Sequence, residues 1–543
     1  MKKRITILLA LSVLTLFPLI AQTATARIDK SMSIYNDVMR QLDMSYADTL
    51  NYEKMSETAI NQMLRQVDPY TVYIPEDKTN NLTFMTTGKY GGIGAVIMQR
   101  GDTVCISEPY EGKTAQKNDV RAGDRLLEVD GTKVVGMTTA EVSSLLRGTP
   151  KSVVTLKLVR DGHAKPVTRS FEREEVKISP VAYSASLPGK IGYIAFTEFT
   201  ENSASLFGQT LDGLVSEKGI ERLIIDLRGN VGGLIDEAVK LLSLFVDKGT
   251  EVVSTKGKTP SSCRTYKTPL APRYPTMPLL VIVDNNTASA AEIVAGALQD
   301  LDRATLLGER TFGKGLVQTV RPIAYNGHLK VTTAKYYIPS GRCIQAIDYR
   351  SADRNNGKIQ ENDSIAHTAF YTKKGRIVRD GGGITPDIIM QDSSKMNITY
   401  SLYVQNFFFD YATRYRRTHD SIDTPDKFVI TDEELADFKE FIAGKNFRYS
   451  TETEKNLDKL IAIAEHEDID QEITDQLTTL REKLAGNWQD SFDRNTDNIR
   501  QLLGREIVQR YYYQKGEYAY FLRFDEQLKR AVEEIQKENT DPR

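Results

Sequence analysis

A serine and a lysine in the middle of the chain could together perform nucleophilic catalysis. Ser289 follows the apolar run Leu279–Val283 and precedes a segment, beginning at Ala290, whose residues favour a helix. A hydroxyl at this point lies near a helix amino terminus, where unpaired N–H groups and the helix dipole stabilise negative charge. Lys314 could act as the general base if its amine is uncharged. These residue types predict acyl transfer from a serine alkoxide.

Both residues also have a purely structural interpretation. Ser289 followed three residues later by Glu292 forms a capping box, and Lys314 stands between two glycines, as in an exposed turn. A lysine serves as a base only if its amine is neutral at the working pH, and burial can lower its pKa from about 10.4 by up to roughly 3–5 units. The apolar residues beside Lys314 are compatible with such burial. A histidine is the usual base, but none lies near Ser289 in the sequence and no G-x-S-x-G motif is present. A distant histidine could still fold into the site.

Two sequence blocks around these residues resemble the carboxyl-terminal processing proteases, the S41 family of serine peptidases with a Ser–Lys dyad. The blocks are T-A-S-A-A-E-I-V-A-G-A-L-Q-D and G-E-R-T-F-G-K-G-L-V-Q. By this resemblance Ser289 is the nucleophile, Lys314 is the general base, and Gln318 orients the lysine. The chain departs from the family pattern at Thr287 and Ala291, where serines are usual. These departures leave the reacting hydroxyl in place.

A glycine-rich loop earlier in the chain could form an oxyanion hole. The sequence D-L-R-G-N-V-G-G begins at the end of the apolar run Arg222–Asp226. Glycines at such a turn often serve only to permit unusual backbone angles, but they also let a substrate carbonyl approach backbone N–H groups. The loop is similar to the oxyanion loop of the same proteases. The expected donors are therefore the amide of Gly232 or Gly233 and the amide of Ala290, and which glycine donates is open.

The segments around these motifs predict an α/β catalytic core over residues 177–392. Apolar strands such as Ile191–Ile194 alternate with helical segments such as Phe199–Val215, which favours a mainly parallel sheet. Periodicity does not distinguish a doubly wound sheet from the crotonase/ClpP-like core that the family resemblance implies. Two later blocks, Y-Y-I-P-S-G-R-C-I-Q and G-G-G-I-T-P-D-I, also resemble the family. Residues 348–364 between them are polar and predict an exposed loop.

Residues 88–176 resemble a PDZ domain. G-K-Y-G-G-I-G-A-V-I is followed by A-G-D-R-L-L-E-V-D-G, a helix-like T-T-A-E-V-S-S-L-L-R-G and the alternating run S-V-V-T-L-K-L-V. In such domains a glycine-rich loop binds the terminal carboxylate of a peptide, which adds as a strand. Gly91, Gly92, Ile93 and Gly94 match that loop. A plain hairpin turn is the alternative, whereas a phosphate loop is disfavoured because no Walker lysine or GxGxxG motif is present.

Helical regions are predicted on both sides of these domains. Residues 27–87 carry apolar residues at helical spacing in two runs, and Asp68-Pro69 ends the second. Residues 393–543 are charged and helix-like, with aromatic clusters at 407–409 and 511–513. Acidic residues interleaved with the basic ones favour packed helices over a nucleic-acid surface. The fold class is therefore multidomain α/β, with a crotonase/ClpP-like core, a PDZ domain and helical N- and C-terminal regions. The role of the C-terminal region is open.

The composition of the chain narrows the classes of function. A length of 543 residues predicts three or four domains, and a net charge of −2 gives no electrostatic reason to expect nucleic-acid binding. Five scattered histidines and three cysteines lack metal-ligand spacing, so we expect neither a metal nor another cofactor. One disulfide is the most that three cysteines allow, and free thiols are the alternative.

Residues 1–26 have the pattern of a signal peptide. Three basic residues precede the apolar stretch Ile5–Ala21, and small residues offer cleavage after Ala21 or Ala26. A signal anchor is the alternative, although Pro18 and the small residues favour cleavage. No other segment is long and apolar enough to span a membrane. We therefore expect an exported protein, periplasmic in the first instance, with surface attachment or secretion as alternatives.

Together these features predict an exported serine endopeptidase that cleaves proteins or peptides selected through their free C-termini. A homo-oligomer or an adaptor protein stays open. Two other classes of function are compatible with parts of the sequence: a non-hydrolytic PDZ scaffold, in which Ser289 is only a helix cap, and a crotonase-like acyl-CoA enzyme. Export argues against the second, because CoA thioesters are cytosolic.

Overall fold

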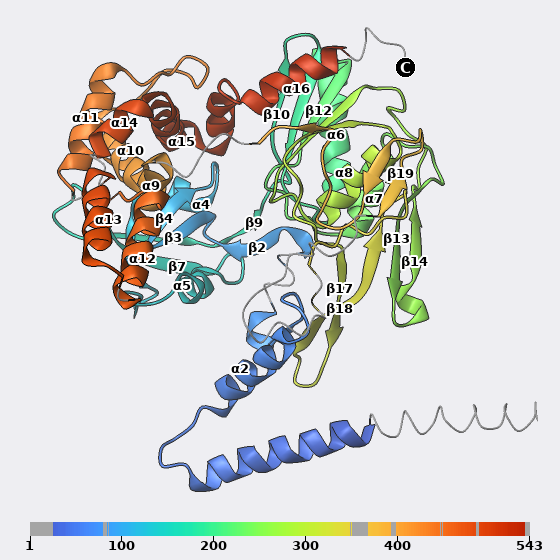
Figure 1. The fold of residues 1–543 in the computed structure, drawn as a ribbon, viewed down its shortest axis with the longest axis horizontal. Helices are drawn as coiled ribbons and strands as arrows, with labels where there is room; N and C mark the ends of the chain where they lie inside the picture. The colour runs from blue at the N-terminus through green and yellow to red at the C-terminus, as the bar shows by residue number, and fades with distance from the viewer. Residues whose placement is uncertain are drawn as a thin grey trace, which may run out of the picture. The chain divides into compact units, whose positions relative to one another are not determined.

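The computed structural model describes residues 25–79, 84, 86–347, 349, 368–391, 398–445, 447, 449–467, 469–484 and 488–537. The chain divides into two compact units, Met1–Tyr73 and Ile74–Arg543, and the ribbon is drawn in Figure 1. Nearly all of the predicted signal peptide and nearly all of the polar loop 348–364 lie outside the described residues.

The first unit contains the two helices expected in the N-terminal region. One covers residues 25–45, and the other is α2 (Tyr52–Arg65). The carboxylate of Asp68 accepts hydrogen bonds from the amides of Tyr70 and Thr71 at 2.8 and 2.7 Å. This turn ends the helical path at the predicted Asp-Pro step. A short strand, β1 (Val72–Ile74), follows.

The region that resembles a PDZ domain folds as an antiparallel sheet with two helices. Its main sheet has the strand order β3 (Ala95–Arg100), β4 (Thr103–Pro109), β5 (Arg125–Val129), β7 (Val153–Val159) and β8 (Val167–Glu172), with β6 (Thr132–Lys133) beside β5. A second ribbon pairs β2 (Lys89–Gly92) with β9 (Glu174–Lys177). The helices are α4 (Thr114–Lys117) and α5 (Thr139–Leu146), and α5 begins at a Thr138/Glu141 capping box.

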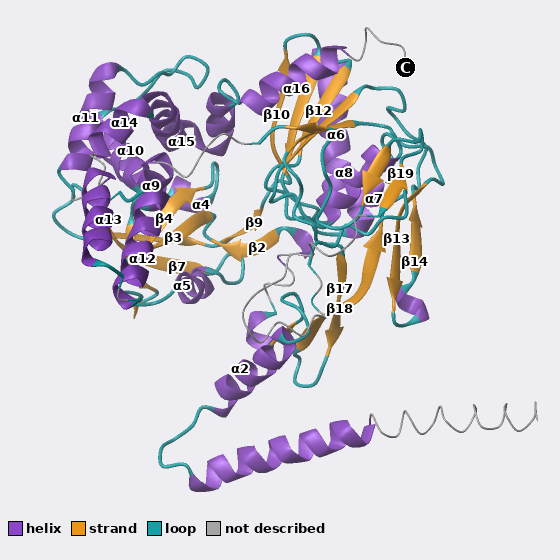
Figure 2. Cartoon of the chain, in the orientation of Figure 1, coloured by secondary structure: helices purple, strands orange, loops and turns teal. Residues whose placement is uncertain are grey.

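The predicted catalytic core is built on a six-stranded sheet. Its order is β10 (Val181–Leu187), β11 (Ile191–Phe196), β12 (Arg222–Asp226), β15 (Leu279–Val283), β16 (Thr305–Gly308) and β21 (Ile388–Ile389). Only β10 runs antiparallel to its neighbour, which confirms the mainly parallel α/β prediction (Figure 2). Parallel strands need helical crossovers, so both faces of such a sheet become covered.

Helices cover the two faces of this sheet from different parts of the chain. The helices α6 (Ser203–Lys218), α7 (Ile235–Leu242) and α8 (Ala290–Asp300) pack on the face that includes Ile225 and Val281. The opposite face, which includes Ile224 and Ile282, is covered by α16 (Glu526–Lys537). Successive strand residues point to opposite faces, so each strand contributes to both cores. A helix from the far C-terminus thus completes the catalytic core.

Helix α6 begins later than the sequence predicts. The helix was expected from Phe199, but it starts at Ser203. Phe199 instead pairs as a bridge with Gly233, and its amide donates to the carbonyl of Gly232 at 2.9 Å. A long-range backbone contact therefore displaces the local helical preference at this position.

A second sheet stands beside the helices of the core. It includes the hairpin β17 (Leu316–Pro322) and β18 (His328–Tyr337), followed by β13 (Glu251–Gly257) and β14 (Arg264–Lys267). A small hairpin joins β19 (Ala369–Tyr371) to β20 (Ile377–Arg379). Among all described helices, none is both long and apolar enough to cross a membrane. Cys105, Cys263 and Cys343 are all free thiols.

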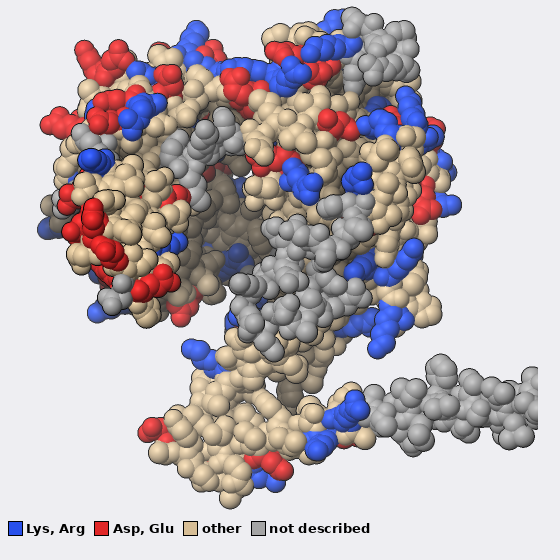
Figure 3. Space-filling view, in the orientation of Figure 1, with Lys and Arg blue, Asp and Glu red and all other residues tan. Residues whose placement is uncertain are grey.

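The C-terminal region is helical and has its own hydrophobic core. Its helices are α9 (Ile398–Val404), α10 (Phe407–Thr418), α11 (Asp432–Ala443), α12 (Glu452–His466), α13 (Gln471–Leu484), α14 (Trp488–Arg494) and α15 (Thr496–Phe521). Phe408, Tyr411 and Phe438 are buried in that core, which confirms the prediction of packed aromatics. On the visible face, acidic and basic side chains are interspersed over these helices (Figure 3).

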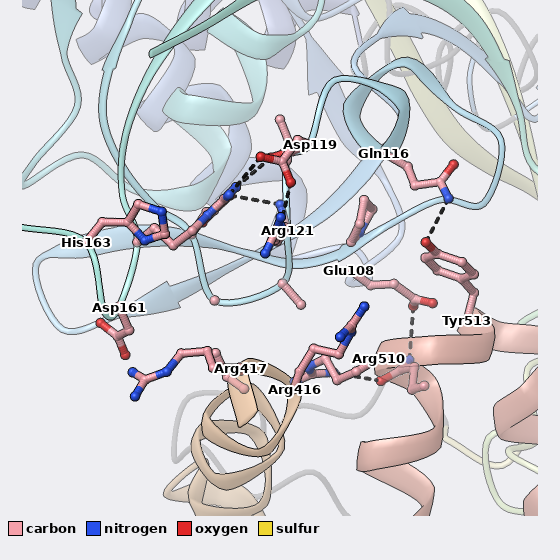
Figure 4. A pocket seen from close by; sticks show the side chains of 18 residues that line it. Glu108, Gln116, Asp119, Arg121, Asp161, His163, Arg416, Arg417, Arg510 and Tyr513 are labelled. Atoms are coloured by element: carbon pink, nitrogen blue, oxygen red, sulfur yellow. Dashed lines mark hydrogen bonds and ion pairs between the residues drawn. The ribbon is translucent and has the colours of Figure 1, made fainter. Parts of the chain in front are cut away.

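The C-terminal helices contact the PDZ domain through polar pairs. Arg100 donates to both carboxylate oxygens of Asp410 at 2.7 and 3.0 Å. Gln116 donates to the hydroxyl of Tyr513 at 2.7 Å, beside a cavity of about 320 Å³ between the two parts (Figure 4). Helix α15 departs from helical geometry at Tyr513 (φ 53°, ψ −161°). The helical region and the PDZ domain therefore share a specific interface.

Candidate active site

Ser289 occupies a strained turn between β15 and α8. Its backbone has φ 57° and ψ −118°, a positive φ that costs free energy for a residue other than glycine. Ser289 and Glu292 form the predicted capping box, in which the Ser289 amide donates to the Glu292 carboxylate at 2.8 Å. An ordinary helix N-cap has extended backbone angles and does not need this strain.

Glu292 connects the serine turn to the lysine loop. Its carboxylate oxygen Oε2 accepts from the amides of both Ser289 and Lys314, at 2.8 and 2.9 Å. The other oxygen, Oε1, accepts from the hydroxyl of Thr311 at 2.6 Å and from the amide of Gly313 at 2.8 Å. Because one oxygen atom receives both amides, the backbones of Ser289 and Lys314 cannot lie further apart than two hydrogen bonds laid end to end.

Burial and hydrogen bonding have opposite effects on the Glu292 carboxyl. The side chain is fully buried, and this desolvation raises its pKa to about 7. The hydrogen bonds from Thr311, Lys314, Gly313 and Ser289 favour the ionised form and limit the rise. A buried carboxylate with four donors is a rigid connector between the two loops.

The lysine loop is held closely by its neighbours. Gly313 has φ +84°, and a Cβ there would lie 2.6 Å from the Cβ of Ala346, so only glycine fits. The amide of Gly315 donates to the side chain of Gln345 at 2.8 Å. Lys314 itself is half-buried. Gln318 lies on β17 and donates to the hydroxyl of Thr332 at 3.3 Å, so its predicted role in orienting Lys314 stays a prediction.

The glycine-rich loop lies directly against the serine. A Cβ on Gly232 would come within 2.8 Å of both the Ser289 Cβ and the Ala290 amide nitrogen. Glycine is therefore required at this close approach. The amide of Gly232 already donates to the side chain of Asn230 at 2.9 Å. Within the part of the chain that is described, the amide of Gly233 donates no hydrogen bond, and this favours Gly233 over Gly232 as a donor to substrate.

Asn230 holds this loop in place from inside. Its side chain is fully buried and donates to the carbonyl of Phe196 at 2.8 Å. Its backbone carbonyl accepts from the amide of Ala288, next to the serine, at 2.9 Å. No sequence motif indicates a role for Asn230, and the motif at Glu292 indicates only a helix cap. The contacts of Asn230 and Glu292 join segments that are far apart in the sequence. A local sequence pattern can therefore indicate only the capping box.

The PDZ loop has its carbonyl groups turned into the domain. The carbonyl of Ile93 accepts from the amide of Ala115 at 2.9 Å, and that of Gly94 accepts from Tyr110 at 2.9 Å. Across the described residues, the amides of Ile93 and Gly94 donate no hydrogen bond. Gly94 (φ +72°) also lies against Lys113, where a Cβ would meet the lysine side chain at 2.5 Å. Gly91 and Gly92 belong to β2, and the carbonyl of Gly91 accepts from Gly148 at 3.1 Å.

Family models match three successive parts of the chain. Residues 190–350 match peptidase family S41, residues 106–160 match a PDZ domain, and residues 398–535 match the model described as "probable PDZ-protease, C-terminal helical domain". The fold and these matches define a serine peptidase with an attached PDZ domain.

Relatives extend this match. A carboxy-terminal-processing protease from Bartonella bacilliformis is 35% identical over 321 residues, which cover 59% of this chain and 73% of the relative. A Staphylococcus aureus protein described as a probable CtpA-like serine protease is 32% identical over 60% of this chain and 64% of its own length. A solved structure of the photosystem II D1 C-terminal processing protease is 29% identical, with 64% of this chain and 84% of that chain covered and a TM-score of 0.35. The chain belongs to the S41 family of carboxy-terminal-processing serine proteases.

Proposed function

We propose that this protein is an exported endopeptidase that uses Ser289 and Lys314 as a catalytic dyad. The observation that carries the proposal is the shared Glu292 oxygen, which holds the backbones of the two residues side by side. The strained turn at Ser289 and the adjacent Gly232 support it, because both are features of a loop built around a reacting atom. Export rests on the signal-peptide pattern of residues 1–26.

In the proposed reaction, the neutral amine of Lys314 takes the proton of the Ser289 hydroxyl as its oxygen attacks a peptide carbonyl. The oxyanion accepts hydrogen bonds from the amides of Ala290 and Gly233. The protonated lysine then donates to the leaving amine, the C–N bond breaks, and water hydrolyses the acyl-enzyme. In this proposal, Gln318 orients the side chain of Lys314.

Substrate selection is assigned to the PDZ loop. The amides of Ile93 and Gly94 would bind the terminal carboxylate of a substrate. The substrate would then be an unfolded or flexible C-terminal segment. Its residue preference follows from neither loop.

Cleavage of an unfolded protein tests this function against a peptide-binding scaffold. Wild-type protein should cut fluorescein-labelled casein, whereas Ser289→Ala and Lys314→Ala should each lower kcat by at least about a thousandfold with an unchanged circular dichroism spectrum. Peptides with a free C-terminus should be cut faster than the same peptides with an amidated end. A Ser289→Ala variant that cuts at the wild-type rate would refute the nucleophile assignment, and an inactive wild type would favour the scaffold.

A further inference from the structure

The segment before the catalytic loop glycines carries an arginine that reaches the C-terminal helix. Arg228 lies in D-L-R-G-N-V-G-G, and its guanidinium donates to Asp226 at the end of β12 and to Asp525 just before α16. The Arg228–Asp525 hydrogen bond is 2.5 Å long. Arg228 also donates to the side chain of Gln527 at 3.0 Å. No motif in the sequence indicates a function for these residues.

Asp525 uses its two carboxylate oxygens for different tasks. Oδ1 accepts from the amide of Leu528 at 3.0 Å and so caps α16, while Oδ2 accepts from Arg228. Only 3% of the Asp525 side chain is exposed. A charge-assisted hydrogen bond at this degree of burial is strong and well directed.

Helix α16 gives Asp525 a fixed position. Its residues Leu528, Ala531 and Ile535 are buried against the catalytic sheet, together with Ile224 and Ile282 of the central strands. Gln527 adds a hydrogen bond to the carbonyl of Met390 at 2.8 Å. The helix is therefore part of the rigid core rather than a loose appendage.

The loop that Asp525 reaches needs such an anchor. Gly229, Gly232 and Gly233 all have positive φ, so its backbone has an unusually large conformational entropy to lose. Asp226 is only two residues from Arg228 and also accepts from the Tyr193 hydroxyl of β11 at 2.6 Å, so it holds the guanidinium to the strands of the sheet. Asp525 connects the guanidinium of Arg228 to a separate element, helix α16, from a position 297 residues further along the chain.

We propose that Asp525 is a positioning residue for the oxyanion loop, acting through Arg228, so that the C-terminal helical region takes part in catalysis. The inference rests on the proposed function, in which this loop donates to the oxyanion. Loss of the Arg228–Asp525 contact leaves the substrate-binding surface intact and affects only the position of the amides that donate to the oxyanion. This change should lower kcat and leave KM unchanged.

Asp525→Asn is the sharpest test, because asparagine keeps the helix cap but removes the charge that faces Arg228. In the full chain we expect kcat on fluorescein-labelled casein to fall about tenfold, with KM within about twofold. Labelling by a fluorophosphonate should slow by a similar factor, since the Ser289 oxygen displaces fluoride at phosphorus while the P=O oxygen occupies the oxyanion site. Asp525→Glu, which retains the charge, should restore part of the rate.

Glu526→Gln is the matched control. Glu526 is the next residue, is exposed, and bonds only to Lys529 within the described residues, so this variant should keep wild-type kcat. Wild-type kcat and labelling in Asp525→Asn would overturn the inference, as would a kcat loss matched by an equal loss of folded protein at the assay temperature. If wild-type protein is not labelled at Ser289, the proposed function itself fails, and the inference falls with it.

Discussion

At the residue scale, Glu292 is the connection between the two proposed catalytic groups. It accepts four hydrogen bonds, and each of its oxygens is shared by two donors. An amide in its place can offer only one oxygen, so two donors would face an NH₂ group. The residue neither touches substrate nor exchanges a proton in the proposed reaction. Its role is to position Ser289 and Lys314.

Glu292→Gln should therefore lower kcat by up to about 100-fold, because a shift of about 1 Å in a reacting group can cost that much. The KM for fluorescein-labelled casein should change little, because the PDZ loop is distant in the sequence and makes no described contact with this carboxylate. Glu251→Gln, at an exposed position on β13, is the control and should be unaffected. Equal kcat values for Glu292→Gln and wild type would show that the shared carboxylate does not set the geometry.

At the scale of elements, the proposed nucleophile and the proposed oxyanion loop both follow parallel strands. Ser289 follows β15 and the glycine-rich loop follows β12, and these strands are neighbours in the sheet. The carboxyl ends of neighbouring parallel strands meet at one edge, which is where α/β proteins place their sites. The lysine arrives from a different direction, on the loop before β17. The position of Lys314 therefore depends on the conformation of its loop, which includes Gly313 at φ +84°.

Gly313→Ala tests that backbone shape. The new methyl group would meet both a left-handed backbone (φ +84°) and the Cβ of Ala346, so we expect a loss of about 2–3 kcal/mol in stability and a strong fall in kcat. Thermal unfolding and casein cleavage measure the two effects.

Gly375→Ala separates backbone strain from crowding. Gly375 has φ +86°, but a Cβ there meets nothing within 4 Å. The Gly375→Ala variant should lose only about 1 kcal/mol in the free energy of unfolding and keep the wild-type kcat. A Gly313→Ala enzyme as stable and active as Gly375→Ala would mean that the lysine loop tolerates rearrangement.

At the scale of the whole molecule, the C-terminal helices contact both the PDZ domain and the catalytic core. Gln509 on α15 donates at 3.0 Å both to Glu108 of the PDZ domain and to Glu517 (Figure 4 shows Glu108 at this interface). Burial raises the pKa of Glu108 to about 7, and the neighbouring carboxylate of Glu517 adds to the rise. The interface therefore contains a carboxyl group that titrates near neutral pH.

This titration predicts a pH-dependent interface. A pKa raised in the folded state makes the Glu108 contribution to stability complete below about pH 4.5 and lost as the pH rises through about 7. Relative to Glu108→Gln, wild-type protein should lose on the order of 1–3 kcal/mol between pH 5 and pH 8. Melting temperatures measured at the two pH values check this.

Glu111→Gln, at a nearby exposed position, serves as the control and should follow the wild type. If Glu108→Gln shows the same change between pH 5 and pH 8 as the wild type, the Glu108 carboxyl does not govern the interface.

The strands and the types of the reactive residues can be predicted from local sequence patterns. Arg222–Asp226 and Leu279–Val283 are strands with the predicted bounds, because a short apolar run closed by turn residues is a local signal. The PDZ and S41 matches agree with the resemblances stated from motifs alone. The roles of Ser289, Lys314, Gln318 and the oxyanion donors stay predictions.

Contacts between segments that are far apart in the chain are visible only in the folded structure. The connection from Ser289 through Glu292 to Lys314, the occupied amide of Gly232, and the place of α16 beneath the catalytic sheet all arise from contacts between segments far apart in the chain. Local propensity carries no information about such contacts, because they depend on which surfaces the whole chain buries together. The start of α6 at Ser203 rather than Phe199 has the same cause, since a backbone bridge to Gly233 outweighs the helical preference there.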